Sequence, residues 1–288
     1  MEKPTKIPLE DNYEDIIQKA RRGWGLSVEK LCGLSGISTE AWAAACEGIF
    51  DEPTARALAP ILKLAPAALV AIGRRAWEPA PVKNECIHQV NTPFRDMRVN
   101  AYLLHDPSSK DAVIFDTGTD ADPLIRAVRE KGLHLRAICL THAHPDHIAD
   151  LQTLRQAFPD VPCFCPAKEI VDNATPADPG IDLRTGSLRI EARSTPGHSP
   201  GGTTYVLTLA GARIAIVGDA LFAGSMGGAA NAWASALETN TREILSLPGN
   251  TILCPGHGPM TTVAEERTHN PFSVPKDERT HFNGPGVL

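Results

Sequence analysis

Three histidines and one aspartate are crowded into the seven residues Thr-His-Ala-His-Pro-Asp-His, which run from Thr141 to His147. The chain has only 10 histidines in 288 residues, so this local density is unusual. Imidazole and carboxylate groups bind zinc and iron in proteins. His142 and His144 are two residues apart, so an extended segment places both on one side, whereas Asp146 and His147 lie beyond the bend. The segment therefore predicts a metal site in which these side chains face two neighbouring points.

Polar side chains that could complete such a site follow apolar runs elsewhere in the chain. His198 lies among small residues in Ser-Thr-Pro-Gly-His-Ser-Pro-Gly-Gly, Asp219 follows Ile-Ala-Ile-Val-Gly, and His257 follows Ile-Leu-Cys-Pro-Gly. Glycines beside them allow the backbone to bend sharply and to approach an ion closely. Asp116 ends the run Val-Ile-Phe, and it could bind a metal or accept a hydrogen bond from a ligand histidine. Besides Asp116, the candidate ligands are five histidines and two aspartates at the ends of predicted strands.

The elements that must position these residues are the strands and helices of an α/β domain. Apolar runs predict buried strands over residues 101–105, 111–118, 135–144, 212–220 and 250–258. Helical patterns lie between some of them, over residues 120–132 and from near Ile148 to Phe158. The second of these helices begins where the histidine-rich segment ends, so it fixes the exit of that segment.

The chain has a different character before residue 80. Residues 11–76 predict short helices, of which the first stops at Gly23 and two begin at Pro53 and Pro66. Glu78 to Val82, Glu-Pro-Ala-Pro-Val, reads as a linker. We therefore expect a small all-α domain over residues 1–80, followed by a catalytic α/β domain over residues 81–288.

Composition narrows the classes of protein to consider. The net charge of −6 argues against a general nucleic-acid binder, and we find no signal peptide and no apolar run that could span a bilayer. The seven cysteines are an odd number without a Cys-x-x-Cys pair, which predicts a reduced cytoplasmic protein without a disulfide framework. Cys163 and Cys165 are predicted to be two buried residues on one strand face rather than a metal-binding pair.

The ordered set of candidate ligands resembles the metallo-β-lactamase superfamily over roughly residues 83–272. That resemblance implies an αββα sandwich with two divalent metal ions at one sheet edge, zinc first and iron or manganese as alternatives. It assigns one ion to His142, His144 and His198, the other to Asp146, His147 and His257, and the bridging position to Asp219, with a hydroxide between the ions. It also implies catalytic roles for two aspartates: Asp146 would orient the nucleophile, and Asp116 would support the site from outside the ligand set.

Residues 255–272, Pro-Gly-His-Gly-Pro through Asn-Pro-Phe, are similar to the ending of short glyoxalase II-like hydrolases. This implies cleavage of a small-molecule thioester or related activated ester, although the C-terminal helical domain of full-length glyoxalase II is not present after Phe272. A persulfide dioxygenase, with one iron on His142, His198 and Asp219, and a lactonase are the alternatives. A surface salt bridge is the preferred interpretation of Arg267, ahead of a contact with a substrate carboxylate. His269 and His281 are expected to lie outside the site.

Residues 26–48 resemble the helix-turn-helix of Cro/repressor-type domains, with Gly36 at the turn and Ile37 in the core. DNA reading needs hydrogen-bond donors on the second helix and cations for phosphates. That helix offers Glu40, Trp42 and Glu47 but no Arg, Lys, Asn or Gln, and residues 1–80 hold 10 basic against 11 acidic residues. DNA binding is therefore not expected, and a homodimer contact or a lid beside the active site is preferred over a DNA-linked regulator.

Overall fold

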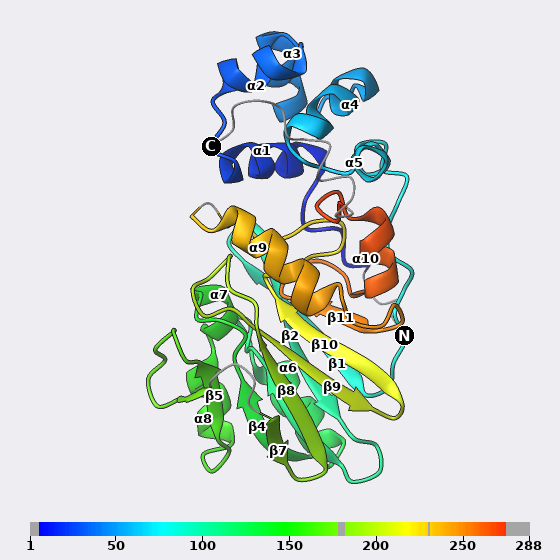
Figure 1. Cartoon of the computed structure of the whole chain (residues 1–288). Coiled ribbons are helices and arrows are strands. Elements are labelled where there is room, and N and C mark those ends of the chain that lie inside the picture. Colours follow the sequence, from blue (N-terminus) through cyan, green and yellow to red (C-terminus); the bar gives the residue numbers. More distant parts are fainter. Residues whose placement is uncertain (1–5, 178–181, 230, 275–288) are drawn as a thin grey trace.

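The structure is a computed structural model that describes residues 6–177, 182–229 and 231–274. Five short helices gather at one end of the molecule, beyond the ends of the strands (Figure 1). They are α1 (Tyr13–Gly23), α2 (Val28–Ser35), α3 (Thr39–Cys46), α4 (Glu52–Ile61) and α5 (Pro66–Gly73). The predicted N-terminal helices are thus confirmed, including the stop of the first helix at Gly23.

Side-chain caps explain where these helices begin. The side chains of Ser27, Ser38 and Asp51 each accept a hydrogen bond from a backbone N–H in the first turn of the helix that follows. Gly36 ends α2 with a φ of 73°, a left-handed conformation that suits glycine. Ile37 then packs against the helical core, as expected from the sequence.

Two mixed six-stranded sheets follow the helices. The first has its strands in chain order: β1 (Ile87–Phe94), β2 (Met97–His105), β3 (Asp111–Phe115), β4 (His134–Cys139), β5 (Cys163–Pro166) and β6 (Thr175–Ala177). The second runs in reverse order and contains β7 (Asp182–Thr185), β8 (Leu188–Ser194), β9 (Thr203–Leu209), β10 (Ala212–Gly218), β11 (Ile252–Pro255) and β12 (Thr261–Thr262).

Three apolar layers hold this part of the molecule together. The largest side chains between the sheets are Tyr102 and Phe115 from one sheet and Tyr205 from the other. On the outer face of the first sheet lie α6 (Asp122–Glu130) and α8 (Leu151–Ala157), and on that of the second lie η1 (Asn240–Ile244), a π-helical turn, and α10 (Val263–His269). The observed fold is the expected αββα sandwich preceded by a helical region.

The sandwich brings the predicted site residues to one edge because of its strand directions. Strands β3 and β4 are parallel, as are β10 and β11, so the carboxyl ends of each pair lie side by side. The helix predicted from near Ile148 to Phe158 is observed as α8. A separate short helix that was not predicted, α7 (Pro145–Ile148), precedes it and begins at a proline, which suits the first position of a helix. Asp146 and His147 therefore lie in a helical turn.

The helical region shares a core with the sandwich. The buried residues of α1 to α5 form one cluster with Met226, with Trp233 of α9 (Trp233–Thr239) and with Phe272. Glu78 to Val82 has no regular secondary structure, in keeping with the linker prediction. No helix in the described ranges is long and apolar enough to cross a membrane.

Candidate metal centre

Seven side chains converge at the edge of the sandwich, and Asp219 lies at their centre. Its Oδ1 is 3.2 Å from His147 Nε2, and its Oδ2 is 3.3 Å from Nε2 of both His198 and His257. His142 Nε2 is 3.9 Å from the same Oδ2. One carboxylate thus faces four of the five predicted histidines.

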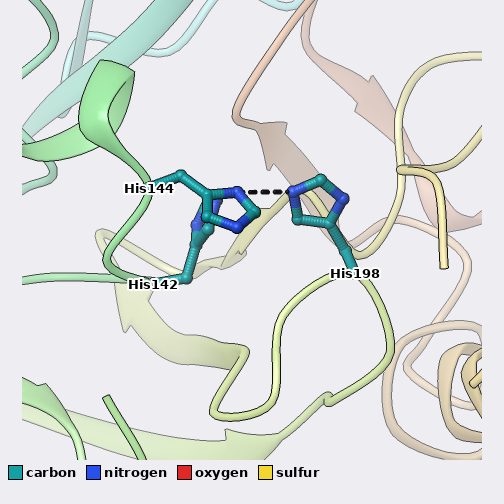
Figure 2. Close-up of side chains that lie close together, drawn as sticks. All are labelled: His142, His144 and His198. Atoms are coloured by element: carbon teal, nitrogen blue, oxygen red, sulfur yellow. Dashed lines mark hydrogen bonds between the residues drawn. The ribbon is translucent and has the colours of Figure 1, made fainter. Parts of the chain in front are cut away.

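His142, His147 and Asp219 form one group whose donor atoms lie within 4.8 Å of one another, and two triplets beside it meet the same limit. His142, His144 and His198 form the first, and Figure 2 shows His144 Nδ1 facing His198 Nε2 at 2.9 Å. Asp146, His147 and His257 form the second. The structure therefore brings together all seven residues that the sequence suggested as ligands, in the two sets that the family resemblance implied.

Hydrogen bonds on the far side of the ring orient four of the five histidines, those that face Asp219. His198 Nδ1 donates to Gly228 O at 3.0 Å, and His257 Nδ1 donates to Arg98 O at 2.7 Å. His142 Nδ1 lies 3.0 Å from Thr141 Oγ1. In each case the Nε2 atom is left to face the site, which is how proteins commonly orient metal-binding histidines.

Asp116 performs the same orienting task for His147. Its Oδ2 accepts from His147 Nδ1 at 2.8 Å and from Thr141 Oγ1 at 2.7 Å, and its Oδ1 accepts from Thr141 N at 2.7 Å. Asp116 has a φ of 56°, an uncommon conformation for a residue other than glycine, which here turns the carboxylate back under the histidine-rich segment. Asp116 therefore lies behind the candidate ligands rather than among them.

The acidic and basic side chains of this cluster shift one another's pKa values. Burial is the largest influence on His147 and His257 and by itself lowers their pKa values, but their acidic neighbours together outweigh it. Asp219 and Asp116 raise the pKa of His147 to about 10, and Asp219, Asp146 and Glu10 raise that of His257 to about 11. The pKa of Asp219 lies well below its usual range because His147 and His257 overcome the effect of burial. Burial also lowers the pKa of His142 and His198, so they are neutral and ready to act as ligands.

Unsatisfied atoms test whether metal ions fit this arrangement. His142 Nε2, His147 Nε2 and Asp219 Oδ1 are buried without a hydrogen-bond partner among the described residues. Buried polar atoms are rarely left without a partner, since each costs free energy. All three point into the cluster of nitrogen and oxygen donors, a donor set that suits zinc and iron. The residues therefore fit a metal centre.

Close backbone approach is built into the same edge. A Cβ atom on Gly256 would lie 2.1 Å from Asp219 Oδ1 and 2.6 Å from His147 Cε1. Only glycine therefore fits before His257, which explains one of the glycines noted beside the candidate ligands.

Glu169 is a site residue that the sequence did not reveal. One carboxylate oxygen accepts from Ala143 N at 2.6 Å, and the other accepts from Ser199 Oγ at 2.6 Å and Gly201 N at 2.7 Å. This carboxylate therefore joins the histidine-rich segment to the loop that carries His198. Its surroundings, Ala-Lys-Glu-Ile, carry no motif, so only tertiary structure could identify it.

The ending at residues 255–272 folds back to support the loop that follows Asp219. Glu266 accepts from Thr261 Oγ1 at 2.8 Å, Asn270 Nδ2 at 2.8 Å and Gly224 N at 3.0 Å, and Asn270 Nδ2 also donates to Ser225 O at 2.8 Å. Residues 255–272 thus hold the loop that follows Asp219 in place.

Arg267, His269 and the two neighbouring cysteines do not contribute ligands to the candidate metal centre. The surface salt bridge predicted for Arg267 is wrong, because its guanidinium donates to the carbonyl oxygens of Leu245 and Leu247, both at 2.7 Å. His269 stacks on Trp77, away from the metal centre as expected, and His281 lies outside the described residues. Cys163 and Cys165 are both buried in the layer outside the first sheet, as predicted.

Comparison with known proteins decides the family, because the family model of the metallo-beta-lactamase superfamily matches residues 95–257. The chain belongs to the metallo-β-lactamase superfamily. Among its relatives, probable metallo-hydrolase YqgX of Bacillus subtilis is 34% identical over 62% of this chain and 94% of its own length. The human mitochondrial persulfide dioxygenase ETHE1 is 33% identical over 59% of this chain and 69% of its own. A hydroxyacylglutathione hydrolase of Xanthomonas axonopodis is 34% identical over 51% and 56%.

Proposed function

We propose that this member of the superfamily is a metal-dependent hydrolase that cleaves a thioester or a related activated ester. The observation that carries the proposal is the complete second triplet, Asp146, His147 and His257, beside the first. Asp219 contacts residues of both triplets and is the proposed bridge between two divalent ions, with zinc preferred. When bound, such ions lower the pKa of water and polarise a carbonyl group.

The protein residues divide the remaining tasks. His198 is the most accessible of the histidines in contact with Asp219, with 21% of its side chain exposed, whereas His142, His147 and His257 have 3% or less. We infer that the substrate carbonyl enters on the His144–His198 side. Asp146 Oδ2 is 3.3 Å from His257 Nε2 and 3.6 Å from His147 Nε2, so Asp146 is placed to orient the attacking water.

A persulfide dioxygenase is the second candidate function. His142, His198 and Asp219, the set that the resemblance assigns to one iron, lie together, and the similarity to human ETHE1 favours this candidate. The hydrolase is preferred because one iron leaves the second triplet unused.

A paired assay on protein of measured metal content separates the two candidates. One arm follows thiol release from S-lactoylglutathione, from small acyl thioesters and from lactones, and the other follows oxygen uptake with glutathione persulfide. We expect metal-dependent thiol release and two ions per chain. Oxygen uptake without hydrolysis, together with one iron per chain, would contradict the hydrolase proposal.

For the N-terminal region we propose a helix-turn-helix-like fold that does not read DNA. Trp42 of α3 is only 5% exposed and lies under the guanidinium of Arg21, so it cannot reach a base. Glu40 and Glu47, the other side chains noted on this helix, are exposed and acidic and would repel phosphates. A gel-shift assay at low salt should show no sequence-specific complex; nanomolar binding to one sequence would overturn this proposal.

A further inference from the structure

Helix α1 contacts the 222–228 segment, Phe222–Gly228, which follows Asp219 and in turn contacts the metal centre. Lys19 Nζ donates to Met226 O at 2.7 Å and lies 5.4 Å from the ring centre of Phe222. Asp11, just before α1, accepts from both Lys19 Nζ and Ser225 Oγ. In Figure 1, α1 (dark blue) lies between the helices α2 and α3 and the sandwich, above α9.

The same segment contacts the candidate ligands on its other side. Gly227 N donates to Asp219 O at 3.0 Å, and Gly228 O accepts from His198 Nδ1 at 3.0 Å. A Cβ atom on Gly227 would lie 2.1 Å from Asp219 O and 2.8 Å from His198 Nδ1. The segment is therefore packed without spare room, so a shift of its backbone must move His198 or Asp219.

The Asp11–Lys19 pair is well shielded from water. The side chain of Lys19 is 14% exposed and that of Asp11 is 11% exposed. Removing one member of such a pair leaves the other charge poorly solvated, so the pair constrains where its partners can lie. Besides contacting each other, Lys19 donates to Met226 O and Asp11 accepts from Ser225 Oγ, and these are two neighbouring positions of the 222–228 segment.

We propose that Asp11 and Lys19 are positioning residues of the metal centre: they hold the 222–228 segment so that Gly228 O orients His198 and Gly227 supports Asp219. The N-terminal helical region is then a component of the metal site rather than an appended interaction module. This inference rests on the proposed metal-binding function.

Metal affinity tests the proposal without relying on turnover. Zinc and cobalt dissociation constants are measured by competition with a chromophoric chelator for wild type, Lys19→Met, Lys19→Arg and Ser225→Ala. We expect the dissociation constant of the ion held by His198 to rise about three- to tenfold in Lys19→Met and by a smaller factor in Ser225→Ala. These changes are smaller than the effect of losing a residue that bonds directly to a ligand, because Lys19 and Ser225 act on His198 through another residue. The visible absorption of the cobalt-loaded protein should change in the same order, and Lys19→Arg should restore part of the affinity.

The exposed Lys30 on α2 provides the matched control, since Lys30→Met makes the same chemical change away from the 222–228 segment. It should leave both readouts at wild-type values. Ser225→Ala keeps the test decisive if Lys19→Met fails to fold. Wild-type affinity and an unchanged cobalt spectrum in the folded variants would overturn the positioning role. Failure of the wild type itself to bind zinc or cobalt would instead overturn the proposed metal function on which it rests.

Discussion

At the scale of single residues, the centre depends on one carboxylate. Among the described carboxylates, Asp219 is the one that lies within 3.3 Å of histidines from both triplets, and its Oδ1 has no hydrogen-bond partner among the described residues. The surrounding histidines are each fixed from behind by a neighbour, so they cannot easily rearrange to replace it.

Asp219→Ala should therefore remove the bridge between the two ions and lower both metal content and turnover by about a hundredfold or more. This loss exceeds the effect of removing a residue that only hydrogen-bonds to a ligand. Metal analysis and thioester hydrolysis measure this loss. Asp160→Ala removes an exposed carboxylate elsewhere and should change neither quantity. Full turnover in Asp219→Ala would show that the site is assigned wrongly.

Glu169→Gln tests the carboxylate that joins two ligand-bearing loops. An amide has one acceptor oxygen where the carboxylate has two. The amide therefore cannot accept from Ala143 N with one of its two terminal atoms and from Gly201 N with the other. We expect metal affinity to fall about tenfold, with little change in the affinity of the Glu85→Gln control, whose side chain is exposed. Equal zinc affinity in Glu169→Gln and wild type would contradict the joining role.

At the scale of elements, α10 supports the loop after Asp219 through a buried acid. Burial raises the pKa of Glu266 to about 7, although Asn270, Thr261 and Gly224 donate hydrogen bonds that oppose the shift. In the unfolded chain the same group has its ordinary pKa of 4.5. Between these values the folded protein binds more protons than the unfolded chain.

The free energy of unfolding of the wild type should consequently fall, relative to that of Glu266→Gln, as the pH rises from 4.5 to 7. The expected difference is on the order of 2 kcal/mol. Chemical denaturation of both metal-free proteins across this range measures it, and the histidines of the metal centre cancel in the comparison. Parallel pH profiles for the two proteins would show that Glu266 is ionised throughout.

At the scale of the whole molecule, one apolar cluster crosses from the helical region to the sandwich. Trp233 of α9 is 3% exposed and makes edge contacts with Trp24 and Phe272 at 6.4 Å and 5.5 Å between ring centres. We infer that the two regions unfold together.

Trp233→Ala should lower the free energy of unfolding by about 3–5 kcal/mol, because it opens a cavity in this shared cluster. A single transition detected equally by fluorescence and by far-ultraviolet circular dichroism is expected for the wild type. Leu34→Ala, at a site that is 52% exposed, should cost little. Two separate transitions in the wild type would instead support independent regions.

Sequence patterns predicted the N-terminal helices, an α/β domain after them and the candidate ligands, and the resemblance to the metallo-β-lactamase superfamily added the αββα arrangement. Strand periodicity, helix caps and a dense histidine motif are local signals, so they are readable from neighbouring residues. The partners of Arg267 were missed because backbone carbonyls leave no mark on composition. The short helix α7 was missed because its four residues are too few to show a helical period, although Pro145 suits the first position of a helix.

The distant residues that support the metal centre are visible in the folded structure alone. Glu169, Lys19 and Asp11 lie in segments without a motif, and each acts through contacts with residues 26 to 214 positions away along the chain. Such contacts depend on how loops pack at the end of the sandwich. No periodicity or spacing in the sequence encodes that packing. The supporting roles of Glu169, Lys19 and Asp11 therefore depend on contacts that form only when the chain folds and the strand ends come together.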